Sequence, residues 1–224
     1  MKLLHYRAPG RRRPPALLVM LPGVGIAPGE FAAHGFVDAA RKQGRVDVAA
    51  AGPDVDLYLD GAIAEAIRQA IVVPALAEGY QRIWFLGLSL GGMGALLLAR
   101  RYAADVAGIV LLAPFLGTPG VVAEVVRAGG LAAWQPGVIA PNDGERKMLA
   151  WLKDHVAAAP RPPVLHLGYG RDDRFAAGHA MLAETLPAER VHVTEGGHDW
   201  QAWSRLWRRI LATEPFAPPK ASPS

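Results

Sequence analysis

Short, continuous apolar runs alternate along most of this chain with longer stretches whose apolar residues recur at helical spacing. A continuous apolar run closed by a turn is typical of a strand buried on both faces, as in a parallel sheet. Strands that alternate with helices predict an α/β protein with a mostly parallel sheet flanked by helices. The expected strands cover residues 16–21, 46–50, 82–86, 106–112, 164–167 and 191–194, and the expected helices cover 30–43, 61–78, 92–102, 145–156, 175–186 and 200–211.

The length of 224 residues suits one domain, which we expect over residues 1–213. Residues 117–142 break the strand–helix rhythm with five glycines and three prolines, and we interpret them as a short cap-like insertion. The tail, residues 214–224, holds four prolines and little apolar surface, so we expect it to be disordered.

Composition excludes several classes of protein. The absence of cysteine excludes disulfides, thiolate metal sites and a cysteine nucleophile. No apolar run reaches the roughly 18 residues of a membrane-spanning helix, so we expect a cytoplasmic protein with no membrane partner. The net charge is +4, but outside Arg11–Arg13 the basic residues are scattered, so no nucleic-acid partner is expected. No histidine pair has a zinc-binding spacing, so no metal is expected.

The pentapeptide from Gly87 to Gly91 has the pattern G-x-S-x-G, with Ser89 at its centre. It follows an apolar strand and opens an Ala/Leu-rich helix, which is the setting in which this pattern presents a nucleophile. A serine on such a sharp turn has a strained backbone, so its neighbours two positions away must lack a Cβ. The alternative interpretation is an ordinary glycine-rich turn.

A serine nucleophile needs a base, and the base needs an acid that orients it. His198 follows the expected strand 191–194, and Asp172 and Asp173 follow the expected strand 164–167. These residues come in the chain order Ser, Asp, His, each just beyond the carboxyl end of a strand, where α/β sheets place their ligands. Ser89, one of the two aspartates and His198 are therefore expected to meet at one edge of the sheet.

The segments 87–92, 170–175 and 196–198 resemble those of the α/β-hydrolase superfamily, and specifically of its small serine esterases, over about residues 15–212. The resemblance implies the α/β-hydrolase fold with a shortened N-terminus, since only one short strand fits before residue 16. The G-x-x-D pattern of the family falls on Asp173, with Asp172 as the alternative. The resemblance also implies that the backbone N–H groups of Leu90 and Val24 bind the oxyanion, although Pro22-Gly23 replaces the usual His-Gly.

Three aromatic residues are candidates for the wall of a substrate pocket. Phe115 lies just beyond an expected strand, Trp134 lies in the insertion, and Tyr58 is a weaker candidate. Trp134 is equally well explained as packing of the insertion. Arg171 and Arg174 flank the candidate acid and could attract an anionic group, although such residues are more often solvated or paired with carboxylates.

These features predict a cofactor-free serine hydrolase that cleaves carboxylic ester or thioester bonds of a small acyl substrate through an acyl-enzyme. The same three residues could instead act on an amide, a lactone or a carbon–carbon bond, because the pocket and not the triad selects the bond. The alternative from another class is a catalytically silent binding protein on a hydrolase scaffold.

Overall fold

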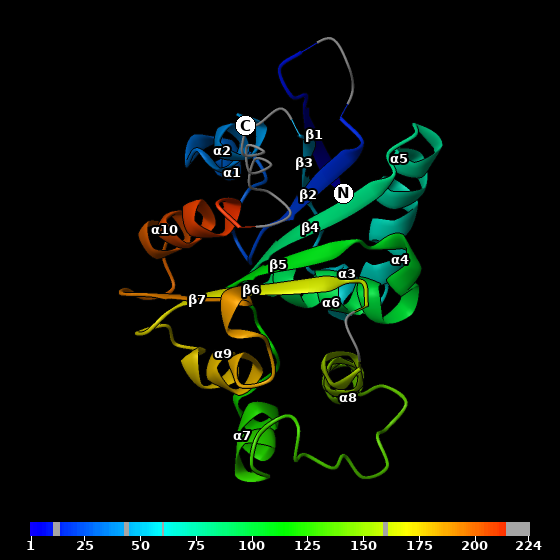
Figure 1. Cartoon of the computed structure of the whole chain (residues 1–224). Helices are drawn as coiled ribbons and strands as arrows, with labels where there is room; N and C mark the ends of the chain where they lie inside the picture. Colours follow the sequence, from blue (N-terminus) through cyan, green and yellow to red (C-terminus); the bar gives the residue numbers. More distant parts are fainter. Residues whose placement is uncertain (11–13, 43–44, 60, 159–160, 214–224) are drawn as a thin grey trace, which may run out of the picture.

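A computed structural model describes residues 1–10, 14–42, 45–59, 61–158 and 161–213. The predicted disordered tail 214–224 and the Arg11–Arg13 run lie outside these residues. One seven-stranded sheet with the order β1-β3-β2-β4-β5-β6-β7 runs through the molecule (Figure 1). Its strands are β1 (Lys2–Tyr6), β2 (Ala16–Leu21), β3 (Val46–Gly52), β4 (Arg82–Leu88), β5 (Gly108–Leu112), β6 (Val164–Gly170) and β7 (Val191–Thr194).

All neighbouring strands pair in parallel except β1, which pairs antiparallel with β3. Every residue of β2 and β5 is buried, as expected for central strands covered on both faces. The predicted mostly parallel α/β sheet is therefore confirmed, and β1 is the short strand expected before residue 16.

The helices cover both faces of the sheet and form two separate cores (Figure 1). One face packs against α1, α2 and α10, which contribute Phe31, Phe36 and Trp207 to the core. The core on the other face includes residues of α4, α5, α6, α8 and α9, and α7 joins it from beyond α9. The helices are α1 (Glu30–Ala33), α2 (Phe36–Arg41), α3 (Asp56–Leu59), α4 (Ile63–Ile67), α5 (Val73–Ala77), α6 (Leu90–Tyr102), α7 (Pro119–Arg127), α8 (Gly144–Ala157), α9 (Ala176–Ala183) and α10 (Trp200–Leu211), with a π-helical turn at Arg68–Val72 and 3-10 turns at Ala103–Asp105 and Ala188–Arg190.

Two of the expected helices are not single regular α-helices. The predicted helix 30–43 is split into α1 and α2 because Gly35 has a left-handed backbone, with φ of 75°. The predicted helix 61–78 continues without a gap, but the π-helical turn Arg68–Val72 links α4 to α5. Pro74 lies in the first turn of α5, directly after the π-helical turn, so its missing N–H coincides with the change in the helical hydrogen-bond pattern.

The segment 117–142 contains α7 and a loop that returns to α8. The side chain of Val122 on α7 lies against Gly178 on α9, and α7 lies beside α9 in Figure 1. Arg146 on α8 pairs with Glu124 on α7 at 2.5 Å. The insertion is thus attached both to α9 and to α8.

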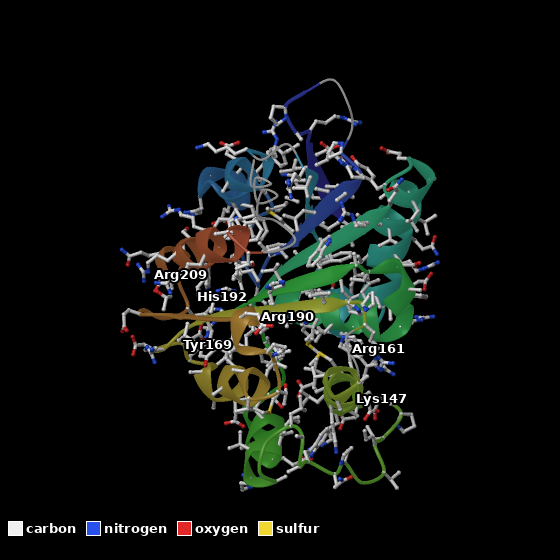
Figure 2. The ribbon with its side chains drawn as sticks, viewed as in Figure 1. Lys147, Arg161, Tyr169, Arg190, His192 and Arg209 are labelled. Carbon is white, nitrogen blue, oxygen red and sulfur yellow. The ribbon has the colours of Figure 1, made fainter. Side chains whose placement is uncertain are left out.

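Figure 2 shows side chains on both faces of β6 and β7. The Tyr169 ring faces α9, with its centroid 5.2 Å from that of His179. On the opposite face, Arg209 of α10 donates a hydrogen bond to the backbone carbonyl of Val193, which ties α10 to β7. Within the described residues, no helix is long and apolar enough to span a membrane.

We expect Gly108→Ala to destabilise the fold. A Cβ at Gly108 would lie 2.2 Å from the ring of Trp84, its register partner on β4. The buried indole would have to move, which typically costs about 1–3 kcal/mol. Gly137→Ala is the control, because a Cβ there would have no heavy atom within 4 Å. Urea unfolding measures both variants, and an equal loss of unfolding free energy would contradict this account.

Candidate active site

Ser89 lies on a sharp turn between the end of β4 and the start of α6. Its backbone has φ of 52° and ψ of −116°, a strained conformation for a residue with a side chain. Three backbone hydrogen bonds hold this turn: the Ser89 N–H donates to Leu112, and the Ser89 carbonyl accepts from Gly92 and Phe115. The strain is therefore held in place by β5 and by the loop that follows it.

Close backbone approaches explain the glycines of the turn. A Cβ on Gly87 would lie 2.5 Å from the Cα of Gly92, and a Cβ on Gly91 would lie 2.1 Å from the carbonyl oxygen of Leu21. Neither gap admits a methyl group. The G-x-S-x-G pattern is thus required by backbone packing at this turn.

The structure brings Ser89, His198 and Asp173 together in one row. The Ser89 Oγ lies 3.0 Å from His198 Nε2, and His198 Nδ1 lies 2.8 Å from Asp173 Oδ2. Asp173 follows β6 and His198 follows β7, at the carboxyl edge of the sheet. A Cβ on Gly170 would lie 2.1 Å from the Gly196 carbonyl oxygen, so the two loops pack in direct backbone contact.

Asp173 and Asp172 have different surroundings. The Asp173 side chain is 0% exposed and accepts hydrogen bonds from His198 and from the Phe175 N–H. Burial acts to raise the pKa of this carboxyl, but those hydrogen bonds outweigh it, so the pKa lies below its ordinary value. Asp172 is exposed, and its carboxylate accepts from Gly196 N–H at 3.4 Å. Of the two candidates, Asp173 is the one in contact with His198.

A further histidine, His179, lies near Asp173. It is fully buried on α9, and its Nε2 lies 2.9 Å from the carbonyl oxygen of Pro114 in the loop after β5. Burial lowers the pKa of His179, although the charge of nearby Asp173 partly opposes the shift. The contact with Pro114 ties α9, which begins shortly after Asp173, to the loop after β5.

Val24 and Leu90 are the two residues predicted to bind the oxyanion through their backbone N–H groups. Val24 and Leu90 both line the cavity at Ser89, and within the described part of the chain neither N–H donates a hydrogen bond. Leu90 is the first residue of α6, where the N–H has no partner within the helix. Both predicted donors are therefore available to an oxygen bound at Ser89.

The cavity at Ser89 has a volume of about 410 Å³. Its walls combine the reacting groups with apolar and aromatic side chains. It is lined by Gly23, Val24, Ile26, Ser89, Leu90, Phe115, Arg174, Phe175, His198 and Trp203.

Comparison with solved structures finds the same architecture. The chain superposes on the S-formylglutathione hydrolase of Staphylococcus aureus with a TM-score of 0.63 and 14% identity, covering 94% of each chain. Est1E from Butyrivibrio proteoclasticus gives a TM-score of 0.64 and 12% identity, over 93% of this chain and 92% of that one. A thermophilic esterase from Thermogutta terrifontis gives 0.55 and 15%, over 93% and 90%.

This chain has the α/β-hydrolase fold. Its sequence matches no protein-family model, and a search of curated proteins finds no match either. The turn at Ser89 occupies the strand-to-helix position at which that fold presents its nucleophile.

Of the three aromatic residues predicted to form the wall of the pocket, only one lines the cavity at Ser89. Phe115 lines the cavity. Trp134 does not: it is buried between α7 and α8, where its indole N–H donates to Glu124 and its carbonyl accepts from Lys153. Trp134 therefore packs the insertion against the body of the molecule. Tyr58 lies against Gly94 of α6 and does not line the cavity.

Sequence reasoning missed Phe175 and Trp203 as site residues. Their rings contact the His198 ring edge-on, with centroids 5.3 and 5.0 Å away. Trp203 packs α10 on the sheet and also lines the cavity. Phe175 could have been found, because it lies two residues beyond the candidate acid.

We expect Asp173→Asn to remove the hydrogen bond that orients His198. Proton NMR of the unmodified protein should show a far-downfield, slowly exchanging signal from His198 Nδ1–H, because its acceptor is a buried carboxylate. Asp173→Asn should abolish or strongly shift this signal. Asp172→Asn, one residue away, should leave it in place, and loss of the signal in that variant alone would contradict the assignment of Asp173.

Proposed function

We propose that this protein is a serine hydrolase that cleaves a carboxylic ester or thioester bond of a small acyl substrate through an acyl-enzyme. The observation that carries the proposal is the continuous row from Ser89 Oγ through His198 to Asp173, with spacings of 3.0 and 2.8 Å. Both spacings lie within the hydrogen-bond reach that a nucleophile and its base require. The proposal needs no metal and no cofactor, and it retains the predicted cytoplasmic location.

The first half of the reaction forms the acyl-enzyme. Ser89 Oγ attacks the carbonyl carbon while His198 Nε2 takes the hydroxyl proton. Asp173 holds the ring with Nδ1 protonated and stabilises the imidazolium that forms. The negative charge on the former carbonyl oxygen is met by the N–H groups of Val24 and Leu90, and each such donor is typically worth about 2.7–4 kcal/mol. The C–O or C–S bond then breaks, and His198 returns the proton to the leaving group.

The second half of the reaction releases the acid. A water molecule attacks the Ser89 ester and gives its proton to His198 Nε2. The tetrahedral intermediate collapses, His198 returns the proton to Ser89 Oγ, and the carboxylic acid leaves. Ester and water are thus converted to acid and alcohol, and the protein returns to its starting state.

The names of the structural neighbours agree with this reaction class. One of them is a hydrolase of S-formylglutathione and another is an esterase. They support both an oxygen ester and a thioester as the bond to test first.

Fluorophosphonate labelling tests the nucleophile directly. We expect intact-protein mass spectrometry to show one adduct on the unmodified protein and none on Ser89→Ala, because the probe reacts with an activated serine. Ser204→Ala on α10 is the matched control and should be labelled in full. A folded protein that takes no label would favour the catalytically silent scaffold.

Turnover of a substrate panel then identifies the bond. Short acyl esters and thioesters should be hydrolysed in a Ser89-dependent manner, and Asp173→Asn should lower kcat by about 10⁴-fold. Labelling without turnover of any ester or thioester, accompanied by turnover of an amide, a lactone or a cleavable carbon–carbon bond, would reassign the substrate class and keep the triad.

A further inference from the structure

Among the described residues, Arg174 is the one side chain of permanent charge that lines the Ser89 cavity. It also lines a second cavity of about 250 Å³ between α7 and α9, where it is again the one charged residue. The second cavity is otherwise formed by glycines and apolar side chains such as Val122, Val126 and Ala177. Arg174 and Phe175 line both cavities, so the guanidinium borders the space at Ser89 as well as the cavity between α7 and α9.

Arg174 differs from Arg171, its neighbour on the same loop. The guanidinium of Arg171 pairs with Glu195 at 3.4 Å. No carboxylate of the described residues lies within 4.0 Å of the Arg174 guanidinium. Arg174 is exposed to solvent like Arg171, but it borders two cavities with mainly apolar walls and Arg171 lines neither of them.

The guanidinium of Arg174 is held close to the reacting groups. It lies over the Phe175 ring, 4.9 Å from the centroid. The same ring meets the His198 ring edge-on, with centroids 5.3 Å apart. A single aromatic ring therefore separates the positive charge from the base, and a chain of a few atoms can link a carbonyl at Ser89 to the guanidinium.

An anion is the chemical group that this position favours. A guanidinium stacked on an aromatic ring keeps its N–H edge available, and that edge matches the two oxygens of a carboxylate. Apolar walls exclude water and ions from part of the surroundings, so a charge bound there is screened less than on open surface.

Resting on the proposed ester hydrolysis, we propose that Arg174 is a specificity-determining residue that binds a carboxylate of the substrate. The substrates are then esters or thioesters that carry a carboxylate a few atoms from the bond that is cleaved. This carboxylate can belong to the acyl part, as in a half ester of a dicarboxylic acid, or to the leaving group. In both cases its contact is with the Arg174 guanidinium.

The test compares esters that differ only in charge. For the acyl side, the 4-nitrophenyl half ester of adipic acid is compared with the 4-nitrophenyl ester of adipamic acid, in which a carboxamide replaces the carboxylate. For the leaving-group side, the acetate ester of 4-hydroxybenzoic acid is compared with that of 4-hydroxybenzamide. The charge preference is the ratio of kcat/KM for the carboxylate to kcat/KM for the carboxamide. Differences in intrinsic ester reactivity cancel when a variant's ratio is divided by that of the unmodified protein.

We expect Arg174→Gln to lower the charge preference by about tenfold in at least one of the two pairs, as for the loss of a charge-assisted hydrogen bond. Arg174→Lys keeps the charge and should restore much of the preference. Arg171→Gln is the matched control and should change the ratio by less than about twofold, because its guanidinium pairs with Glu195 and does not line the cavity. High salt should lower the preference of the unmodified protein.

A charge preference that Arg174→Gln leaves unchanged in both pairs would overturn the proposal, and so would an equal loss in Arg171→Gln. Titration calorimetry on the Ser89→Ala protein adds a readout that needs no turnover. Monomethyl adipate should bind more weakly once Arg174→Gln is added, and methyl adipamate should not. If no fluorophosphonate label and no turnover are found, the proposed hydrolase function fails, and this titration still decides whether Arg174 binds the carboxylate.

Discussion

The close approach of backbone segments around Ser89 is the constraint on which the rest of the structure depends. The carbonyl of Leu21 at the end of β2 occupies the space that a Cβ of Gly91 would need. The turn also bonds to Leu112 at the end of β5, through the Ser89 N–H. Three parallel strands therefore converge on one serine. Its unfavourable backbone conformation persists because these neighbours leave no alternative, and its hydroxyl projects beyond the sheet edge.

A second contact of the same kind positions the partners of Ser89. The loops after β6 and β7 touch through Gly170 and Gly196, and the Asp172 N–H donates to the Gly196 carbonyl at 3.1 Å. This contact sets the separation of Asp173 and His198. Helix α10 begins at Trp200, shortly after His198. Its Trp203 belongs to the core on this face of the sheet, and the Trp203 and His198 rings are perpendicular with centroids 5.0 Å apart. The packing of that helix thereby restrains the base.

The cavity combines two kinds of surface. Phe115 and Phe175 meet edge-on, with centroids 5.6 Å apart, and give the Ser89 cavity its aromatic wall. Arg174 lies over the Phe175 ring and adds a positive charge to this cavity and to the one between α7 and α9. In the proposed reaction Ser89, His198 and Asp173 cleave the bond, and Arg174 is the proposed contact for the carboxylate of the substrate. The insertion contributes through α7, and Trp134 contributes only by fixing that helix.

The sequence alone determined the alternation of strands and helices, the mostly parallel sheet, and the order Ser89, Asp, His198 along the chain. These features follow from local rules, because the periodicity of apolar residues and the glycine requirement of a tight turn act over a few neighbouring positions. Only the tertiary structure decided between Asp172 and Asp173 and placed Trp134 outside the pocket. It also brought Phe175 and Trp203 against His198. Among the described residues, it gave Arg171 a carboxylate partner and Arg174 none. Each of these outcomes depends on the direction in which a side chain leaves its loop or helix and on what packs opposite it. Residues far apart in the chain set that environment, and sequence spacing carries no information about it.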